Sequence, residues 1–101
     1  MNQKNIMNAI DNQLVDDYKE MKIYMNRINN ILKDVGLDSR YENYDQFCID
    51  IKKSVRDLMD RTDEIDPMSL IKESLNNMII NKIAEDDDYE EKLLKFLENY
   101  S

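Results

Sequence analysis

Apolar side chains return at helical spacing along most of this chain. In the first segment, one column repeats every seven residues and a second column fills the positions between. The first column consists of Met7, Leu14, Met21, Ile28 and Val35. The second contains Ile10, Tyr24 and Ile31, with Asp17 as its one polar interruption. Such a repeat predicts one long amphipathic helix over about residues 4–35, and Gly36 can take the left-handed conformation that ends a helix.

The second segment begins with a helix-start signature. Ser39 is followed three residues later by Glu42, a spacing at which both side chains can satisfy free backbone amides of the first turn. Further residues then follow at alternating spacings of three and four, which predicts a helix over about residues 40–65. The stripe comprises Tyr41, Tyr44, Cys48, Ile51, Val55, Leu58, Thr62 and Ile65.

The only proline of the chain predicts the start of a third helix. Pro67 follows Asp66; aspartate is a good N-cap, and proline is favoured at the first helical position. The helix is expected over about residues 67–84. Its apolar face consists of Ile71, Leu75, Met78, Ile79 and Ile83, with Leu70 and Ile80 beside it. A helix that is apolar over so wide an arc is expected to be the most enclosed one.

An acidic run at residues 85–91 can be interpreted in two ways. Either Asp87 with Glu90 or Asp88 with Glu91 could cap a fourth helix over about residues 88–100, or the third helix continues through the run. We favour a break or a kink. The last helix would bear Tyr89, Leu93, Phe96, Leu97 and Tyr100. The predicted fold is therefore all-α: a single domain, residues 1–101, forming an antiparallel bundle of three long helices, the last broken to give four.

Composition favours a small helical domain with a charged surface. The 101 residues are 42% hydrophobic and 36% charged, which supports one core. One glycine and one proline are too few for strands joined by tight turns. We expect neither a membrane span, since no apolar run reaches roughly 18 residues, nor a secretory signal. Cys48 is the only cysteine and lies on the apolar stripe of the second helix, so a cytoplasmic protein is predicted.

The side chains that commonly carry catalysis are scarce. Histidine is absent, which removes the commonest general base and zinc ligand, and one cysteine cannot form a thiolate metal site. The sequence has no glycine-rich phosphate loop, and its acidic run lacks the spacing and the glycine of a calcium loop. We therefore predict no enzyme activity, no catalytic residues, no metal site and no cofactor.

Two sets of residues are candidate partner-binding positions. The net charge is −8, and residues 36–66 and 67–101 each carry four more acidic than basic side chains. This balance argues against direct nucleic-acid binding and favours a protein partner. The acidic candidates, for which a plain helix start is the alternative, are Glu85, Asp86, Asp87, Asp88, Glu90 and Glu91. The apolar candidates, for which core filling is the alternative, are Met21, Ile23, Tyr24 and Met25.

The last third of the chain contains a set of residues shared with one protein family. They are Asp66-Pro67, Leu70-Ile71, Leu75 and Asn77, followed later by Tyr89, Glu91, Leu93 and Leu97. On these residues the chain resembles the enterocin A-type bacteriocin immunity proteins. The resemblance implies an antiparallel four-helix bundle that protects a producer cell from its own bacteriocin. In that family, protection acts from the cytosolic side at a sugar-transporter receptor, with specificity largely in the C-terminal region.

These patterns support three functional hypotheses. The leading one is a small acidic protein-binding module, of phage or mobile-element origin, that occupies and inhibits a larger partner. In one version its carboxylates imitate DNA phosphates, as in some anti-CRISPR proteins. The second hypothesis is a bacteriocin immunity protein. The third is a helical assembly or secretion partner that forms a homodimer or larger homo-oligomer through its first helix, as coiled coils do.

Overall fold

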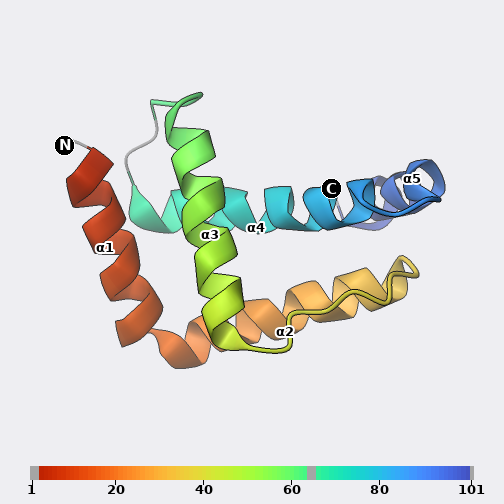
Figure 1. Ribbon diagram of the computed structural model, residues 1–101, viewed down its shortest axis with the longest axis horizontal. Helices are drawn as coiled ribbons and strands as arrows, with labels where there is room; N and C mark the ends of the chain where they lie inside the picture. Colours follow the sequence, from red (N-terminus) through yellow and green to blue (C-terminus); the bar gives the residue numbers. More distant parts are fainter. Residues whose placement is uncertain (1–2, 64–65, 101) are drawn as a thin grey trace.

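The computed structural model describes residues 3–63 and 66–100, which form five α-helices and no strand. The helices are α1 (Gln3–Asp16), α2 (Tyr18–Asp34), α3 (Tyr44–Met59), α4 (Pro67–Ala84) and α5 (Tyr89–Tyr100). Figure 1 shows them in chain order, from red to blue. The all-α prediction is confirmed, and so is the break before the last helix. The predicted number of helices is too low, because the range predicted as the first helix contains two helices, α1 and α2.

The single helix predicted over residues 4–35 is wrong, because the chain bends at Asp17 between α1 and α2 (Figure 1). Asp17 has φ −105° and ψ 35°, outside helical values, although backbone hydrogen bonds continue on both sides of it. This residue is the one polar position in the apolar columns. At the bend it is half-buried, and its carboxylate accepts a hydrogen bond from the side-chain amide of Gln13. The cost of burying a charge on the core side of a straight helix explains why the bend occurs here.

α2 ends at Asp34, and Gly36 is the left-handed residue that follows its C-cap, as predicted. Gly36 has φ +92°, and its amide donates to the carbonyl of Lys33 at 3.0 Å. The amide of Leu37 donates to the carbonyl of Leu32 at 2.9 Å. These two bonds form a Schellman motif, whose left-handed residue is glycine because glycine has no Cβ to clash.

The predicted start of the second-segment helix is wrong. The capping box at Ser39 and Glu42 is not used, and α3 begins at Tyr44. Asn43 is its N-cap, and the Asn43 side chain accepts from the amide of Gln46 at 2.8 Å. The helix also ends at Met59 rather than near residue 65, which itself lies outside the described residues.

The loop between α2 and α3 explains the later start. Leu37 and Tyr41 are each only 5% exposed, so the loop contributes two large side chains to the core. The Asn29 side chain holds the loop in place, because it bonds both the N–H and the C=O of Tyr41, at 2.8 and 2.9 Å. Burial of these side chains outweighs an earlier helix start, since each contributes about 2 kcal/mol.

α4 is the central helix. The Asp66 carboxylate accepts from the amide and the hydroxyl of Ser69, at 3.0 and 2.9 Å, and Pro67 follows at the first helical position, as predicted. α4 packs against each of the other four helices, so it is the most enclosed element, as its wide apolar arc predicted. Its buried residues are Leu70, Ile71, Ser74, Met78, Ile79 and Ile83.

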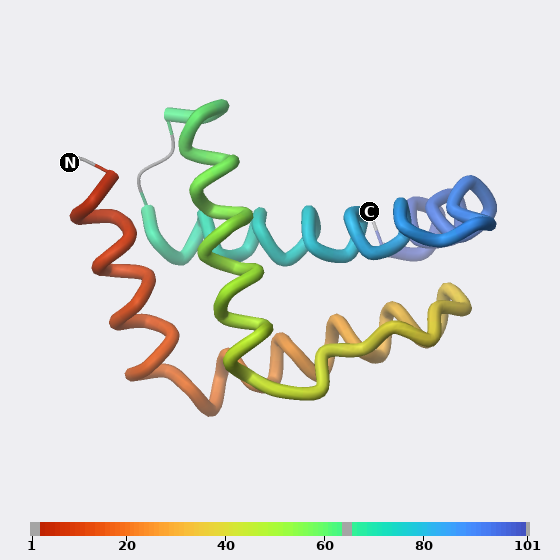
Figure 2. The backbone as a smooth tube through the Cα atoms, viewed as in Figure 1, coloured from red at the N-terminus to blue at the C-terminus, as the bar shows by residue number. Residues whose placement is uncertain are grey.

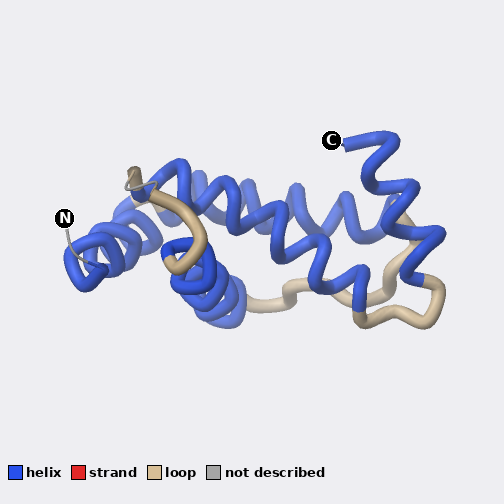
Figure 3. The backbone as a smooth tube through the Cα atoms, turned by 90° about the horizontal axis from the view of Figure 1, so that it is seen from above, coloured by secondary structure: helices blue, strands red, loops and turns tan. Residues whose placement is uncertain are grey.

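The helices cross one another instead of lying lengthwise as one antiparallel bundle. In Figures 1 and 2, α1 and α3 run next to each other in opposite directions, while α2 and α4 run across them in a shared direction. Seen from above in Figure 3, α5 lies near the C-terminal ends of α2 and α4. The radius of gyration is 13.8 Å, close to the roughly 13 Å expected of a compact domain of this length. The described residues therefore form a compact all-helical domain in which α1 and α3 keep the predicted antiparallel relation.

Candidate functional site

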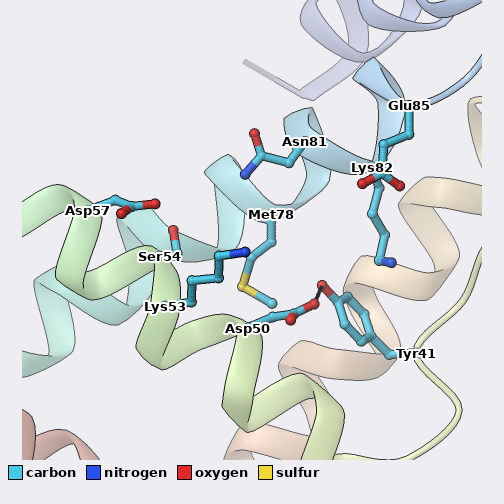
Figure 4. Close-up of a pocket in the computed structure, with 9 residues that line it drawn as sticks. All are labelled: Tyr41, Asp50, Lys53, Ser54, Asp57, Met78, Asn81, Lys82 and Glu85. Carbon is cyan, nitrogen blue, oxygen red and sulfur yellow. Dashed lines mark hydrogen bonds between the residues drawn. The ribbon is translucent and has the colours of Figure 1, made fainter.

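A hollow lies between α3 and α4, and we term it the α3–α4 hollow. Its volume is about 370 Å³, and Figure 4 shows the side chains that line it. One residue comes from the loop before α3, four come from α3, and four come from the C-terminal half of α4 and the residue after it. They are Tyr41, Asp50, Lys53, Ser54, Asp57, Met78, Asn81, Lys82 and Glu85.

Tyr41 is held from several sides of this hollow. Its hydroxyl donates to Asp50 Oδ2 at 2.7 Å, and Lys82 Nζ lies 4.5 Å from the ring centroid (Figure 4). Phe47 packs edge-on against the ring, with the centroids 5.5 Å apart. Asp50 accepts a second hydrogen bond from Gln46 Nε2 at 3.0 Å. Burial, and then the bond to Asp50, raises the pKa of Tyr41 above its ordinary value of 10.0, so the phenol is neutral at physiological pH.

Tyr41 is not poised as a general base in the α3–α4 hollow. Three carboxylates and two ammonium groups line it, and the Asp50 carboxylate is already bonded to Tyr41 and Gln46. A general base works best when its pKa lies near the working pH, and the raised pKa of Tyr41 moves away from that range. The interactions of Tyr41 instead fasten the α2–α3 loop to α3 and α4, so we assign it a structural role.

The six acidic candidates fall into two groups. Asp86 is half-buried; its carboxylate lies 2.7 Å from Lys92 Nζ and accepts from the amide of Asp88 at 3.0 Å. The hydrogen bond between the two side chains lowers the pKa of Asp86 and raises that of Lys92. The other five carboxylates are exposed around the turn between α4 and α5. We term them the acidic corner: Glu85, Asp87, Asp88, Glu90 and Glu91.

The acidic corner also serves the start of α5. Glu90 and Glu91 occupy the first helical turn, where the helix dipole favours negative charge, so the helix-start interpretation is compatible with the structure. Within the described residues, Asp86 is the only member of the acidic run that forms an ion pair. The carboxylates of the acidic corner therefore face solvent and can meet a partner.

The four apolar candidates are divided between core and surface. Met21 and Met25 are 0% and 5% exposed, so they fill the core and cannot contribute to an exposed partner surface. Both lie on the face of α2 that packs inward, one turn apart. Ile23 is 58% exposed, and Tyr24 is partly buried with Arg27 lying 5.4 Å from its ring centroid. The surface predicted from these four residues is thus reduced to Ile23 and Tyr24.

A second hollow, between α2 and α4, was not singled out from the sequence, and we term it the α2–α4 groove. Its volume is about 300 Å³. Five of its eight lining residues are aliphatic or aromatic, and both of its charged residues are basic. The lining residues are Tyr24, Arg27, Ile28 and Ile31 of α2, and Lys72, Leu75, Asn76 and Ile79 of α4. The sequence predicts an apolar face on each of the two helices, but only the packing of α2 beside α4 brings the two sets of lining residues together.

α5 exposes more apolar surface than its predicted stripe implied. Phe96 is its one buried residue, whereas Leu97, placed on that stripe, is 44% exposed. Leu94, which the stripe does not include, is 57% exposed. Leu94 and Leu97 are three residues apart, so they fall on one side of a helix. This spacing was the sequence signal that could have revealed a second apolar strip on α5.

Cys48 and the remaining acidic residues show no metal-binding arrangement in the described part of the chain. No group of three or more histidine, cysteine, aspartate or glutamate side chains there is placed to hold a metal ion. Cys48 is partly buried, and this burial raises the pKa of its thiol. No described helix combines the length and the apolar character needed to cross a membrane.

Comparisons of the chain with protein-family models, with curated proteins and with solved structures give no significant match. The resemblance of the last third to the bacteriocin immunity proteins therefore stays a prediction from the sequence. Three surfaces of the described residues are open to a partner: the acidic corner, the α2–α4 groove and the exposed side of α5.

Proposed function

We propose that this chain is a non-enzymatic protein-binding module whose acidic corner contacts a basic surface of a larger partner. The observation that supports the proposal is the exposure of five carboxylates within seven consecutive residues at one turn. Complementary charge speeds association and selects partners of opposite sign, most strongly at low salt. A positively charged protein surface is therefore the complement of this corner.

The surroundings of the acidic corner favour a protein interface. Tyr89 lies in the middle of the run and is 45% exposed, and it lines a shallow hollow together with Asp87, Asp88, Glu90 and Glu91. Tyrosine is enriched at protein interfaces, where its ring supplies contact area beside polar groups. An aromatic ring flanked by carboxylates can thus add a contact to the Coulomb attraction.

The most specific partner that we propose is a nucleic-acid enzyme. The corner would occupy the place of DNA phosphates in a basic groove, and the chain would act as an inhibitor of the kind that phages or mobile elements encode. Lysine and arginine side chains that contact phosphates in such a groove can also pair with carboxylates. The inhibitor and its substrate DNA would then compete for one surface.

The test is an affinity capture from an extract of the native host with three purified baits. The first is the unchanged protein, and the second neutralises four of the five carboxylates of the corner as D87N/D88N/E90Q/E91Q. The third is a matched control, D16N/E42Q/D60N/D63N, which removes the same number of exposed carboxylates elsewhere. We expect the first and third baits to capture a basic partner and the second to lose it.

Salt and competition complete the test. Affinity for the captured partner should fall by about tenfold or more between roughly 50 and 200 mM salt, and unlabelled DNA should displace the chain if the partner is a nucleic-acid enzyme. Equal capture by all three baits, or an affinity that does not change with salt, would contradict the proposal.

A further inference from the structure

We infer that the α2–α4 groove receives helix α5 of a second copy of this chain. The inference concerns the groove and the exposed side of α5, and it does not depend on the proposed binding of a basic partner by the acidic corner. Two observations carry it: the groove is apolar with a basic edge, and α5 presents an apolar strip with an acidic edge.

The charge of the groove differs from that of the molecule. The chain as a whole carries −8, yet the charged residues that line this groove are Arg27 and Lys72. The α3–α4 hollow, by contrast, is lined by three carboxylates and two lysines. In the described part of the chain, neither Arg27 nor Lys72 forms an ion pair. The groove is therefore a local positive site that an acidic segment would complement.

The lining of the groove is about as long as two turns of a helix. Its lining spans residues 24–31 on α2 and 72–79 on α4, about 10 Å along each helix at 1.5 Å per residue. Ile28 and Ile79 are 2% and 3% exposed, while Tyr24, Ile31 and Leu75 are partly buried beside the core. A helix that binds in such a groove inserts apolar side chains spaced three or four residues apart.

The exposed side of α5 has this pattern. Leu94 and Leu97 are 57% and 44% exposed and lie three residues apart, so they are neighbours on one side of the helix. Glu90, Glu91 and Glu98 are exposed around them, and Lys95 is the basic residue among these positions. The side of α5 that carries the leucines is therefore net acidic and matches the basic edge of the groove.

The position of α5 in its own chain leaves this side accessible. Phe96 is buried in the core, and the Tyr100 hydroxyl donates to Asp34 Oδ2 at 2.6 Å, which fastens α5 near the end of α2. Because every copy has both the groove and the helix, two copies can bind reciprocally, or several can add head to tail. The shared negative charge opposes association, but at physiological salt charges separated by more than about 8 Å are largely screened.

The inference is tested by measuring mass against concentration in analytical ultracentrifugation at physiological salt. We expect self-association with a dissociation constant on the order of 10–100 µM, since the groove is small for a stable interface. L94D should weaken association by at least about tenfold, and so should R27E/K72E. The matched controls are I49D, at a residue 54% exposed on α3, and K4E/K19E, at exposed lysines near helix starts. These should leave association unchanged.

A charge-swap experiment identifies the two contacting surfaces. E98K should weaken self-association, and a mixture of E98K with R27E/K72E should associate more tightly than either variant does alone, because the exchanged charges then face opposite signs. Circular dichroism confirms that each variant is folded.

The results separate this inference from the proposed function. A chain that stays monomeric at about 300 µM would overturn the inference and leave the groove to a segment of another protein. Association that is weakened by I49D but not by L94D would overturn it as well. A chain that dimerises as described yet captures no basic partner keeps the inference and contradicts the proposed function.

Discussion

The crossing of α3 and α4 and the turn between α4 and α5 differ in their polar groups, which include a hydrogen-bonded tyrosine at the crossing and solvent-exposed carboxylates at the turn. At the crossing, Ile51, Val55 and Ile71 are fully buried, and the Tyr41 hydroxyl is bonded to Asp50. At the corner, Phe96 is the one buried residue of α5, and five carboxylates face solvent. Burial and hydrogen bonding at the crossing stabilise the fold, whereas the turn between α4 and α5 leaves charged and apolar side chains exposed.

α4 takes part in both regions, with the crossing along its length and the acidic turn after its last residue. α4 is capped by Asp66 and packed against every other helix, yet a run of acidic residues follows its last residue, Ala84. Elements with few buried contacts open locally at lower free energy than the core does. We therefore expect the crossing to determine global stability and α5 to respond separately.

The largest expected effect is at the crossing. Ile71→Ala removes a side chain that is 0% exposed, and the resulting cavity should lower the free energy of unfolding by about 2–5 kcal/mol. Chemical denaturation followed by circular dichroism measures the change. Ile49→Ala, at a residue 54% exposed on α3, is the control and should stay within about 0.5 kcal/mol. Similar losses from both substitutions would remove the contrast between interior and surface.

A smaller effect is expected from Phe96→Ala. It deletes the one buried side chain of α5, and because we expect this helix to detach while the rest stays folded, the loss should be about 1–3 kcal/mol. Hydrogen exchange should accelerate in α5 while α4 remains protected. If the amides of both helices lost protection together, α4 and α5 would form one cooperative unit and the comparison above would fail.

The smallest effect is a dependence of stability on alkaline pH. Burial raises the folded-state pKa of Tyr41 above 10.0, so its contribution is complete below pH 10. Above that pH the unfolded chain ionises first, and stability should fall by up to about 1.4 kcal/mol per pH unit for this group. Tyr41→Phe should lose about 1 kcal/mol near neutral pH and then decline less steeply than the unchanged protein.

Denaturation midpoints between pH 8 and roughly 11 measure the two slopes. Burial also raises the pKa of Tyr44 and of Cys48, but both groups are present in the two proteins and their contributions cancel in the comparison. Parallel curves would show that the Tyr41 hydroxyl ionises as easily in the folded chain as in the unfolded one.

Local signals in the sequence predicted several boundaries of the fold. Gly36 ends α2, and Asp66 with Pro67 begins α4, because a left-handed residue and an N-cap act through their own backbone neighbours. The capping box at Ser39 and Glu42 failed. There the local preference competed with the burial of neighbouring loop side chains, and that burial depends on where α2 lies.

The candidate sites were predictable to different degrees. Exposure of most of the acidic run follows from the cost of burying many like charges, but the pairing of Asp86 with Lys92 depends on how α5 folds back. Met21 and Met25 are in the core although Ile23, between them, is exposed. Helical spacing already puts Met21 and Met25 on one face and Ile23 on another, but which face is covered depends on the neighbouring helices. The α2–α4 groove combines residues about 45 positions apart, so no local pattern revealed it.

The spacing of apolar residues established that this chain is helical, and Gly36 and Asp66 with Pro67 marked one helix end and one helix start, since these features depend on contacts within a few residues. Tertiary structure decided how the helices cross. It also decided the change of direction at Asp17 and placed a positive groove in a negative molecule. The physical reason is that an amphipathic helix specifies a face to bury but not the neighbour that will cover it.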